Sequence, residues 1–185
     1  METIEVLERE HRTARLVASV ARRDLGHAAR TGVCDRRRVA ELVEFFLSFS
    51  AWCHGPKEER LLATLLHRHG LAREAPALRE LVVGHEGSRI LLDSAGDWLR
   101  LLTAGAESAL QPLLYDLELY LDELERQMAD EEALVFPLAQ RRLRPGDLEE
   151  LGRAFAAVAD EERAAGRAAR REDLARRLAA APADA

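Results

Sequence analysis

Apolar side chains recur every three or four residues along most of this 185-residue chain, a spacing that places them on one face of a helix. The most regular stripe comprises Leu110, Leu113, Leu117, Tyr120, Leu124, Gln127, Glu131, Leu134 and Leu138. Two of its members, Gln127 and Glu131, are polar. A buried carboxylate is costly without a partner, so Glu131 is expected to meet one on another helix.

Two further stripes each carry a histidine among apolar residues. The first predicts a helix over residues 3–25 that holds His11 on its apolar face and ends near Gly26. The other predicts a helix that opens at Glu74–Pro76 and holds His85 on the same kind of face. The pattern leaves open whether this last segment is one kinked helix or two pieces.

A fourth stripe, within residues 35–70, places His54 and Glu58 on its apolar side. The two residues are four apart, so on a helix they lie one turn from each other on the same face. Pro56 lies between them and has no N–H to donate to the preceding turn. The sequence therefore predicts a local kink at this pair.

The remaining chain predicts two shorter helices. One begins at Asp147 and is broken by Gly166. The other covers residues 168–180 and has a thin apolar side, formed by Leu174 and Leu178, that packs either on the bundle or on a second subunit.

These elements predict an all-α fold: an up-down four-helix bundle with additional C-terminal helices. We expect residues 1–165 to form the bundle and residues 166–185 to form a C-terminal helix and tail, with residues 181–185 disordered.

Composition narrows the possible functions. The chain contains no apolar run of about 18 residues, so the sequence predicts no membrane span. The net charge is −6 and Lys57 is the single lysine, which argues against nucleic acid as a partner. The two cysteines, Cys34 and Cys53, are too few for a disulfide framework, so we expect a cytoplasmic protein with reduced thiols.

The polar residues on the four apolar stripes can meet in one layer, because each lies near the middle of its helix. They are His11, His54, Glu58, His85, Gln127 and Glu131. Histidines and carboxylates aimed inward from all helices of a four-helix bundle are typical of a dinuclear metal site. Nitrogen and oxygen ligands without thiolate favour iron or manganese over structural zinc. The alternative is a buried polar network without metal.

The chain resembles the hemerythrin-like, or HHE cation-binding, family, including its longer bacterial members. The resemblance rests on the order and spacing of Glu10-His11-Arg12, Cys53-His54-Gly55-Pro56-Lys57-Glu58-Glu59, Gly84-His85-Glu86-Gly87-Ser88-Arg89 and Asp130-Glu131-Glu132-Ala133-Leu134-Val135-Phe136-Pro137. It implies two non-haem irons in the bundle. Family members bind oxygen, sense oxygen or iron, handle peroxide or nitric oxide, or act as di-iron oxidases.

Carried over by motif, His11, His54 and His85 match metal-binding histidines, and Glu58 and Glu131 match the bridging carboxylates. The sequence departs from the family pattern at two positions. Gln127 stands where the family has a histidine four residues before Glu131. Arg89 stands where oxygen-carrying members have a second histidine, four residues after His85. His11 and His54 would then serve one metal, and His85 would be the only histidine for the other. Further carboxylates that could compensate are Glu59, Glu86, Glu132 and Glu161.

The leading hypothesis is a non-haem di-iron, or depleted di-iron, protein that binds or reacts with O2, peroxide or NO in sensing or redox chemistry. The second is a di-iron or di-manganese oxidase acting on a small organic substrate, which predicts a pocket that reaches the metals. The third is a metal-free interaction or stress-response bundle whose site has decayed.

Overall fold

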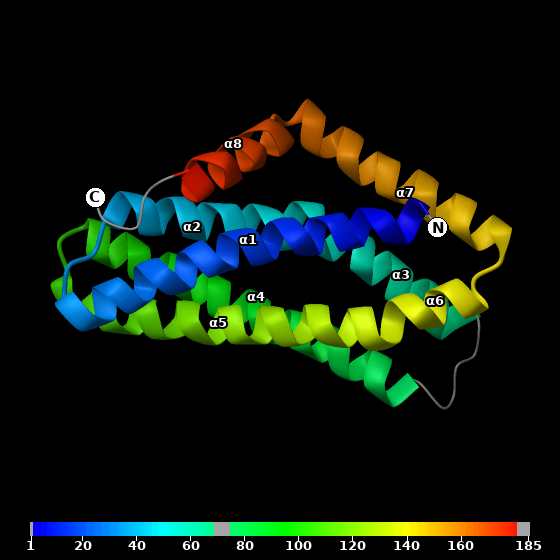
Figure 1. Ribbon diagram of the computed structural model, residues 1–185, viewed down its shortest axis with the longest axis horizontal. Helices are drawn as coiled ribbons and strands as arrows, with labels where there is room; N and C mark the ends of the chain where they lie inside the picture. Colours follow the sequence, from blue (N-terminus) through cyan, green and yellow to red (C-terminus); the bar gives the residue numbers. More distant parts are fainter. Residues whose placement is uncertain (1, 69–74, 181–185) are drawn as a thin grey trace.

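A computed structural model describes residues 2–68 and 75–180, and these residues form helices with no strand (Figure 1). The elements in order are α1 (Glu2–Thr31), α2 (Arg36–Ser48), the π-helix η1 (Phe49–Cys53), α3 (Gly55–Arg68), α4 (Ala75–Thr103), the 3₁₀-helix η2 (Glu107–Ala109), α5 (Leu110–Asp130), the π-helix η3 (Glu131–Val135), α6 (Phe136–Arg142), α7 (Pro145–Ala164) and α8 (Arg167–Ala180).

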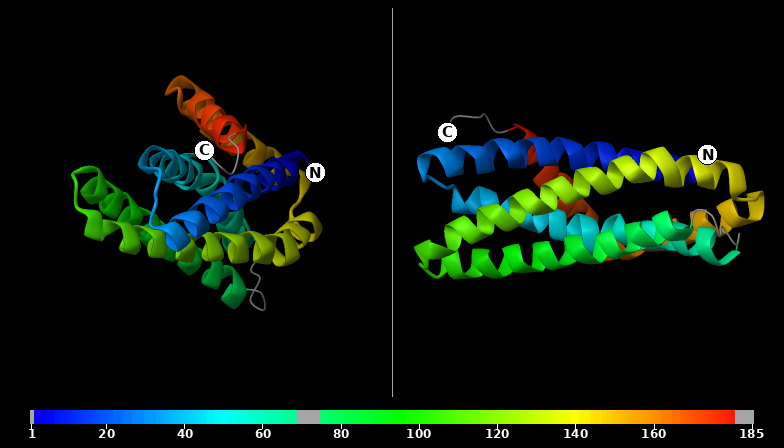
Figure 2. Two further views of the ribbon diagram at one scale, coloured as in Figure 1. Left: turned by 60° about the vertical axis from the view of Figure 1, so that its left-hand side comes forward. Right: turned by 90° about the horizontal axis from the view of Figure 1, so that it is seen from below.

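Four antiparallel rods form the bundle: α1, α2 continued by α3, α4, and α5 continued by α6 (Figure 1). Two further views show α7 and α8 outside these rods, where α7 contacts α3 and α8 contacts α1 and α2 (Figure 2). The predicted all-α bundle with additional C-terminal helices is confirmed.

The apolar core has two parts, separated along the bundle by a polar layer. On α1, Leu7 belongs to one cluster and Ala14 to the other, with His11 between them. Met128 and Val135 flank Glu131 in the same way. The polar layer is therefore enclosed by apolar packing at both ends, where water is scarce and charges interact strongly.

Both π-helices lie next to residues of the polar layer. At the first, the His54 N–H donates to the Phe49 carbonyl oxygen, five residues back, at 2.8 Å. Gly55 follows, and a Cβ there would lie 2.3 Å from the Ser50 carbonyl oxygen. The kink that the sequence predicted around Pro56 is therefore a π-bulge one turn earlier, and π-bulges are frequent at functional sites.

The second π-helix corrects the sequence prediction of an unbroken helix through residue 138. It begins at Glu131 and adds one residue to the turn. The helical phase shifts, so Val135 is buried while Leu134, predicted on the apolar stripe, is only partly buried. Regular three-and-four spacing could not reveal an inserted residue, because Leu134 and Val135 are both apolar.

Other predicted boundaries also change. The first helix does not end near Gly26 but continues to Thr31, where Gly32 adopts a left-handed φ of 71°. The segment with His85 is one continuous helix, α4. Helix α7 starts at Pro145 rather than Asp147, and the Asp147 carboxylate accepts the Arg144 N–H at 2.9 Å. The predicted boundaries at residues 70 and 74 and the predicted disorder of residues 181–185 lie outside the described residues.

Helix α8 packs on its own bundle, which answers one question that the sequence left open. Leu174 and Leu178 are fully buried in the same cluster as residues of α1 and α2. Arg171 and the buried Glu162 form a bidentate ion pair that joins α8 to α7. The predicted division of the chain into a bundle of residues 1–165 and a C-terminal segment of residues 166–185 stays a prediction. No described helix is both long and apolar enough to cross a bilayer.

Candidate metal centre

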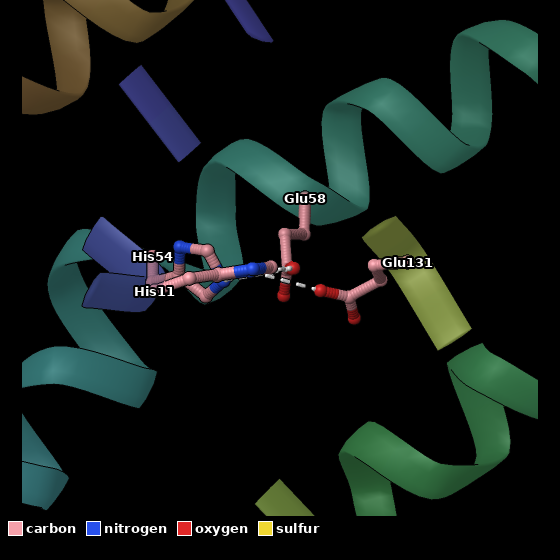
Figure 3. Close-up of side chains that lie close together, drawn as sticks. All are labelled: His11, His54, Glu58 and Glu131. Atoms are coloured by element: carbon pink, nitrogen blue, oxygen red, sulfur yellow. Dashed lines mark hydrogen bonds and ion pairs between the residues drawn. The ribbon is translucent and has the colours of Figure 1, made fainter. Parts of the chain in front are cut away.

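Four buried side chains from three rods point toward one another in the polar layer (Figure 3). His11 comes from α1, His54 precedes α3, Glu58 lies one turn later on α3, and Glu131 begins η3. None is more than 5% exposed, and one ligand atom from each lies within 4.8 Å of the others. This set of two imidazoles and two carboxylates could hold a metal ion.

The distances show how closely these atoms converge. His11 Nε2 lies 3.0 Å from His54 Nε2 and 3.1 Å from Glu131 Oε2, and His54 Nε2 lies 2.8 Å from Glu58 Oε1. Yet neither Glu58 Oε1 nor Glu131 Oε2 accepts a hydrogen bond, although both atoms are buried. Buried carboxylate oxygens without hydrogen bonds are costly, and either a metal ion or protons added to the facing imidazoles would offset their charge.

Each imidazole is held from behind by a carboxylate. Glu132 Oε1 lies 2.8 Å from His11 Nδ1, and Glu10 Oε2 lies 3.0 Å from His54 Nδ1. A neutral imidazole carries one proton, and a carboxylate at Nδ1 keeps the proton there. The two Nε2 atoms then face each other with lone pairs 3.0 Å apart, so a cation or an added proton must lie between them.

A cation in turn supports each of these carboxylates. Arg15 donates to both oxygens of Glu132, at 2.6 and 3.1 Å, and Lys57 donates to Glu10. The Lys57 side chain is buried, whereas the Arg15–Glu132 pair is partly exposed. Such outer partners orient metal ligands and raise their basicity.

In the absence of a metal, protons on the histidines balance the negative charges of the buried carboxylates. Burial lowers the pKa of His11, but the Glu131 and Glu58 carboxylates outweigh it and raise the pKa to about 9. Burial also lowers the pKa of His54. The carboxylates of Glu58 and Glu10 outweigh it and raise that pKa to about 10. Burial and the adjacent Glu58 raise the pKa of Glu131. Protons thus occupy positions that a metal would take.

His85 approaches the same two carboxylates from α4. Its Nε2 lies 3.1 Å from Glu131 Oε1 and 3.4 Å from Glu58 Oε2. Each carboxylate therefore presents one oxygen to the side of His11 and His54 and the other oxygen to His85. This is the arrangement that bridging carboxylates need between two metal ions, and it places one histidine on the second side.

Gln127, the remaining predicted site residue, is buried on α5 but has other partners. Its Nε2 donates to Ser88 Oγ at 3.0 Å and to Glu123 Oε1 at 2.9 Å. Because a carboxylate only accepts, the Glu123 contact fixes which end of the amide carries the nitrogen. Its carbonyl oxygen accepts no hydrogen bond from a described residue. A role for Gln127 as a metal ligand stays a prediction.

The other residues singled out from the sequence lie at varied distances from the layer. Arg89, which would repel a metal if it pointed inward, is exposed and pairs with Glu86. Glu132 supports His11, while Glu161 is exposed on α7. Cys53 is buried, and its thiol lies 3.4 Å from Glu10 Oε1.

Sequence reasoning missed the role of Glu10. It neighbours His11 in the chain, and adjacent helical residues point about 100° apart, so no stripe joins it to the polar layer. Its partners, His54 and Lys57, lie more than 40 positions away. One signal was present: Lys57, the single lysine, lies three residues after His54.

A cavity of about 430 Å³ opens beside the polar layer, between η1, α3, α4 and α5. Its inner end is lined by His54, Glu58, His85 and Gln127. The volume falls in the range of about 300–1,000 Å³ typical of pockets for small organic molecules. The four residues are thus accessible to a ligand from one side.

We predict that Glu10→Gln lowers metal affinity about 10- to 100-fold, because the amide cannot hold the proton on His54 Nδ1 as a carboxylate does. Glu10→Asp should restore part of the affinity. The measurement is competition for Mn²⁺ or Fe²⁺ against a chelator of known affinity. Equal affinity of the wild type and Glu10→Gln would show that the Glu10 contact does not tune His54.

Comparison with known proteins agrees with this geometry. Residues 2–139 match the family model of the hemerythrin HHE cation-binding domain. No curated protein and no solved structure matches the chain. The matched range covers well over half of the sequence and includes the residues of the cluster, from His11 to Glu131, so the chain belongs to the hemerythrin HHE cation-binding family.

Proposed function

We propose that this protein binds two non-haem iron ions in its polar layer and uses them to bind or react with O2, peroxide or NO, in sensing or redox chemistry. The observation that carries the proposal is the convergence of four ligand atoms around two buried carboxylate oxygens that accept no hydrogen bond. Manganese is the alternative metal, since the same oxygen and nitrogen ligands suit it.

Bound iron would supply a site that exchanges electrons with a small oxidant or diatomic ligand. The chain's own residues provide the rest. His11 and His54 would hold one ion and His85 the other, with Glu58 and Glu131 as carboxylate ligands near both. Glu132 and Glu10 keep one proton of His11 and of His54 on Nδ1, so both Nε2 atoms could coordinate once a metal displaces the protons added there.

The proposal is tested by loading the protein with ferrous iron without air and recording its absorption spectrum after addition of O2, peroxide or NO. We expect bands of ferric iron with the oxidants and of an iron–nitrosyl species with NO. The Glu131→Gln variant, loaded identically, is the control. Spectra identical to those of the control would overturn the proposal.

The cavity favours a second candidate, an oxidase that acts on a small organic substrate. O2 or NO occupies a volume similar to that of a water molecule, about 30 Å³ of liquid, so a cavity of about 430 Å³ far exceeds their need. Substrate-dependent oxygen consumption separates this function from sensing. A metal-free bundle, the third possibility, would consume no oxygen and bind no iron.

The raised histidine pKa values predict how metal affinity depends on pH. A metal must displace protons from His11, with a pKa of about 9, and from His54, with a pKa of about 10. Affinity should therefore rise between pH 6.5 and 8.5, by at least about tenfold per pH unit. Chelator competition with Mn²⁺ measures it. A flat profile would show that His11 and His54 are not protonated in the metal-free protein.

The same shifts act on the stability of the metal-free protein with the opposite sign. A histidine whose pKa is raised on folding contributes stability that is fully present below pH 6.5 and is lost as the pH rises through about 9 to 10.

We also propose a cytoplasmic location, because Cys34 and Cys53 are both free thiols.

A further inference from the structure

The cavity beside the polar layer has three zones of different chemistry. Its inner end is polar and consists of the histidines and Glu58 together with Gln127. Its wall also has an apolar part, formed by the buried side chains of Phe49, Leu92 and Leu124. Its outer rim carries exposed charged residues of α3 and α4. The lining therefore suits a ligand that has both an apolar body and a polar group.

The rim is acidic. It carries Glu59, Glu86 and Asp93 against one cation, Arg89. Arg89 is already engaged, since its guanidinium donates to both oxygens of Glu86 at 2.6 Å. Glu59 and Asp93 form no hydrogen bond or ion pair with a described residue. Both carboxylates interact with Arg89 only at longer range, so the opening keeps an excess of negative charge.

The inner end offers acceptors as well. Gln127 is 5% exposed and lines the cavity, with its nitrogen committed to Ser88 and Glu123. Its carbonyl oxygen accepts no hydrogen bond from a described residue. The Gln127 carbonyl oxygen and the anions at the rim favour ligands with N–H donors, and the rim anions disfavour carboxylates and phosphates.

We infer that this cavity binds a small organic amine with an apolar body, whose ammonium group faces Glu59 and Asp93. Binding needs only residues of the chain and does not depend on a metal. The role of the amine as a substrate oxidised at the polar layer rests on the proposed function. Measuring binding to metal-free protein therefore keeps the two questions apart.

The test compares three probes of one shape, benzylamine, benzyl alcohol and benzoate, by calorimetry on the metal-free full chain. Benzylamine is expected to bind at least tenfold more tightly than benzoate, with benzyl alcohol between them. Glu59→Gln combined with Asp93→Asn should weaken benzylamine about 3- to 10-fold and leave benzyl alcohol unchanged. Glu118→Gln with Glu149→Gln, exposed carboxylates away from the cavity, is the matched charge control.

A bulky residue in the rim locates the ligand. Val82 lines the cavity and is 44% exposed, whereas Val83, the next residue on α4, is 71% exposed and does not line it. Val82→Trp should weaken every probe about tenfold or more, and Val83→Trp should have no effect. Equal binding of benzoate and benzylamine, undiminished binding to Val82→Trp, or no binding of benzylamine would each overturn the inference.

Metal content measured on the same samples reports on the proposed function separately. Iron bound without any affinity for amines would sink this inference alone. Amine binding to a chain that takes up no iron would leave the cavity assignment in place and remove the proposed chemistry.

Discussion

Replacing Glu131 by glutamine is expected to lower metal affinity more than about 100-fold while leaving the metal-free fold intact. Glu131 presents one oxygen to His11 at 3.1 Å and the other to His85 at 3.1 Å, so its loss affects both metal positions. An amide oxygen carries no charge and binds iron weakly. The effect should exceed the 10- to 100-fold typical of outer partners such as Glu10.

The stability of the same variant should move little. Burial and the neighbouring Glu58 raise the pKa of Glu131, so a neutral side chain of the same shape suits this position in the metal-free protein. Chelator competition measures the affinity, and thermal unfolding without metal measures the stability. Glu118→Gln, at an exposed residue of α5 away from the cavity, serves as a control. Full iron occupancy in Glu131→Gln would contradict the bridging role.

Replacing Gly55 by alanine is expected to destabilise the protein by about 3 kcal/mol, because the new Cβ would lie 2.3 Å from the Ser50 carbonyl oxygen. In a chain of this size, that lowers the melting temperature by roughly 6–12 °C. The strain could be relieved only by undoing the π-turn of η1. That would rotate His54 relative to Glu58, so metal affinity should fall as well.

Gly87→Ala is the matched control, since Gly87 also lies in a helix but a Cβ there meets nothing within 4 Å. Alanine has the higher helix propensity, so this change should stabilise the protein by about 0.5–1 kcal/mol. Unfolding of both variants by denaturant checks the pair. If Gly55→Ala were as stable as Gly87→Ala, the π-bulge would not depend on a glycine.

The sequence predicted the fold well, because helices with regular apolar stripes reveal both their length and their buried face. It also predicted that polar residues on separate stripes meet, and the structure brings His11, His54, Glu58 and Glu131 into one cluster, with His85 beside it. Their function as ligands stays a prediction.

What the sequence could not predict depends on contacts across the bundle and on helix phase. The π-turn at Glu131 inserts one residue between apolar neighbours, so the pattern of Leu134 and Val135 gives no sign of it. Glu10 lies off the apolar stripe of α1 and reaches His54 only because the fold brings α1 next to the junction of η1 and α3. The contact of Gln127 with Ser88 depends likewise on the packing of α4 against α5, whereas Glu123 lies one turn earlier on α5.

The most direct test of the central claim is elemental analysis of protein loaded with ferrous iron without air and freed of unbound metal. We expect about two irons per chain, one held by His11 and His54 and the other by His85, with both lost in Glu131→Gln. A single iron that disappears with His54→Ala would confine binding to the first position. Wild-type protein that retains neither iron nor manganese would contradict the account.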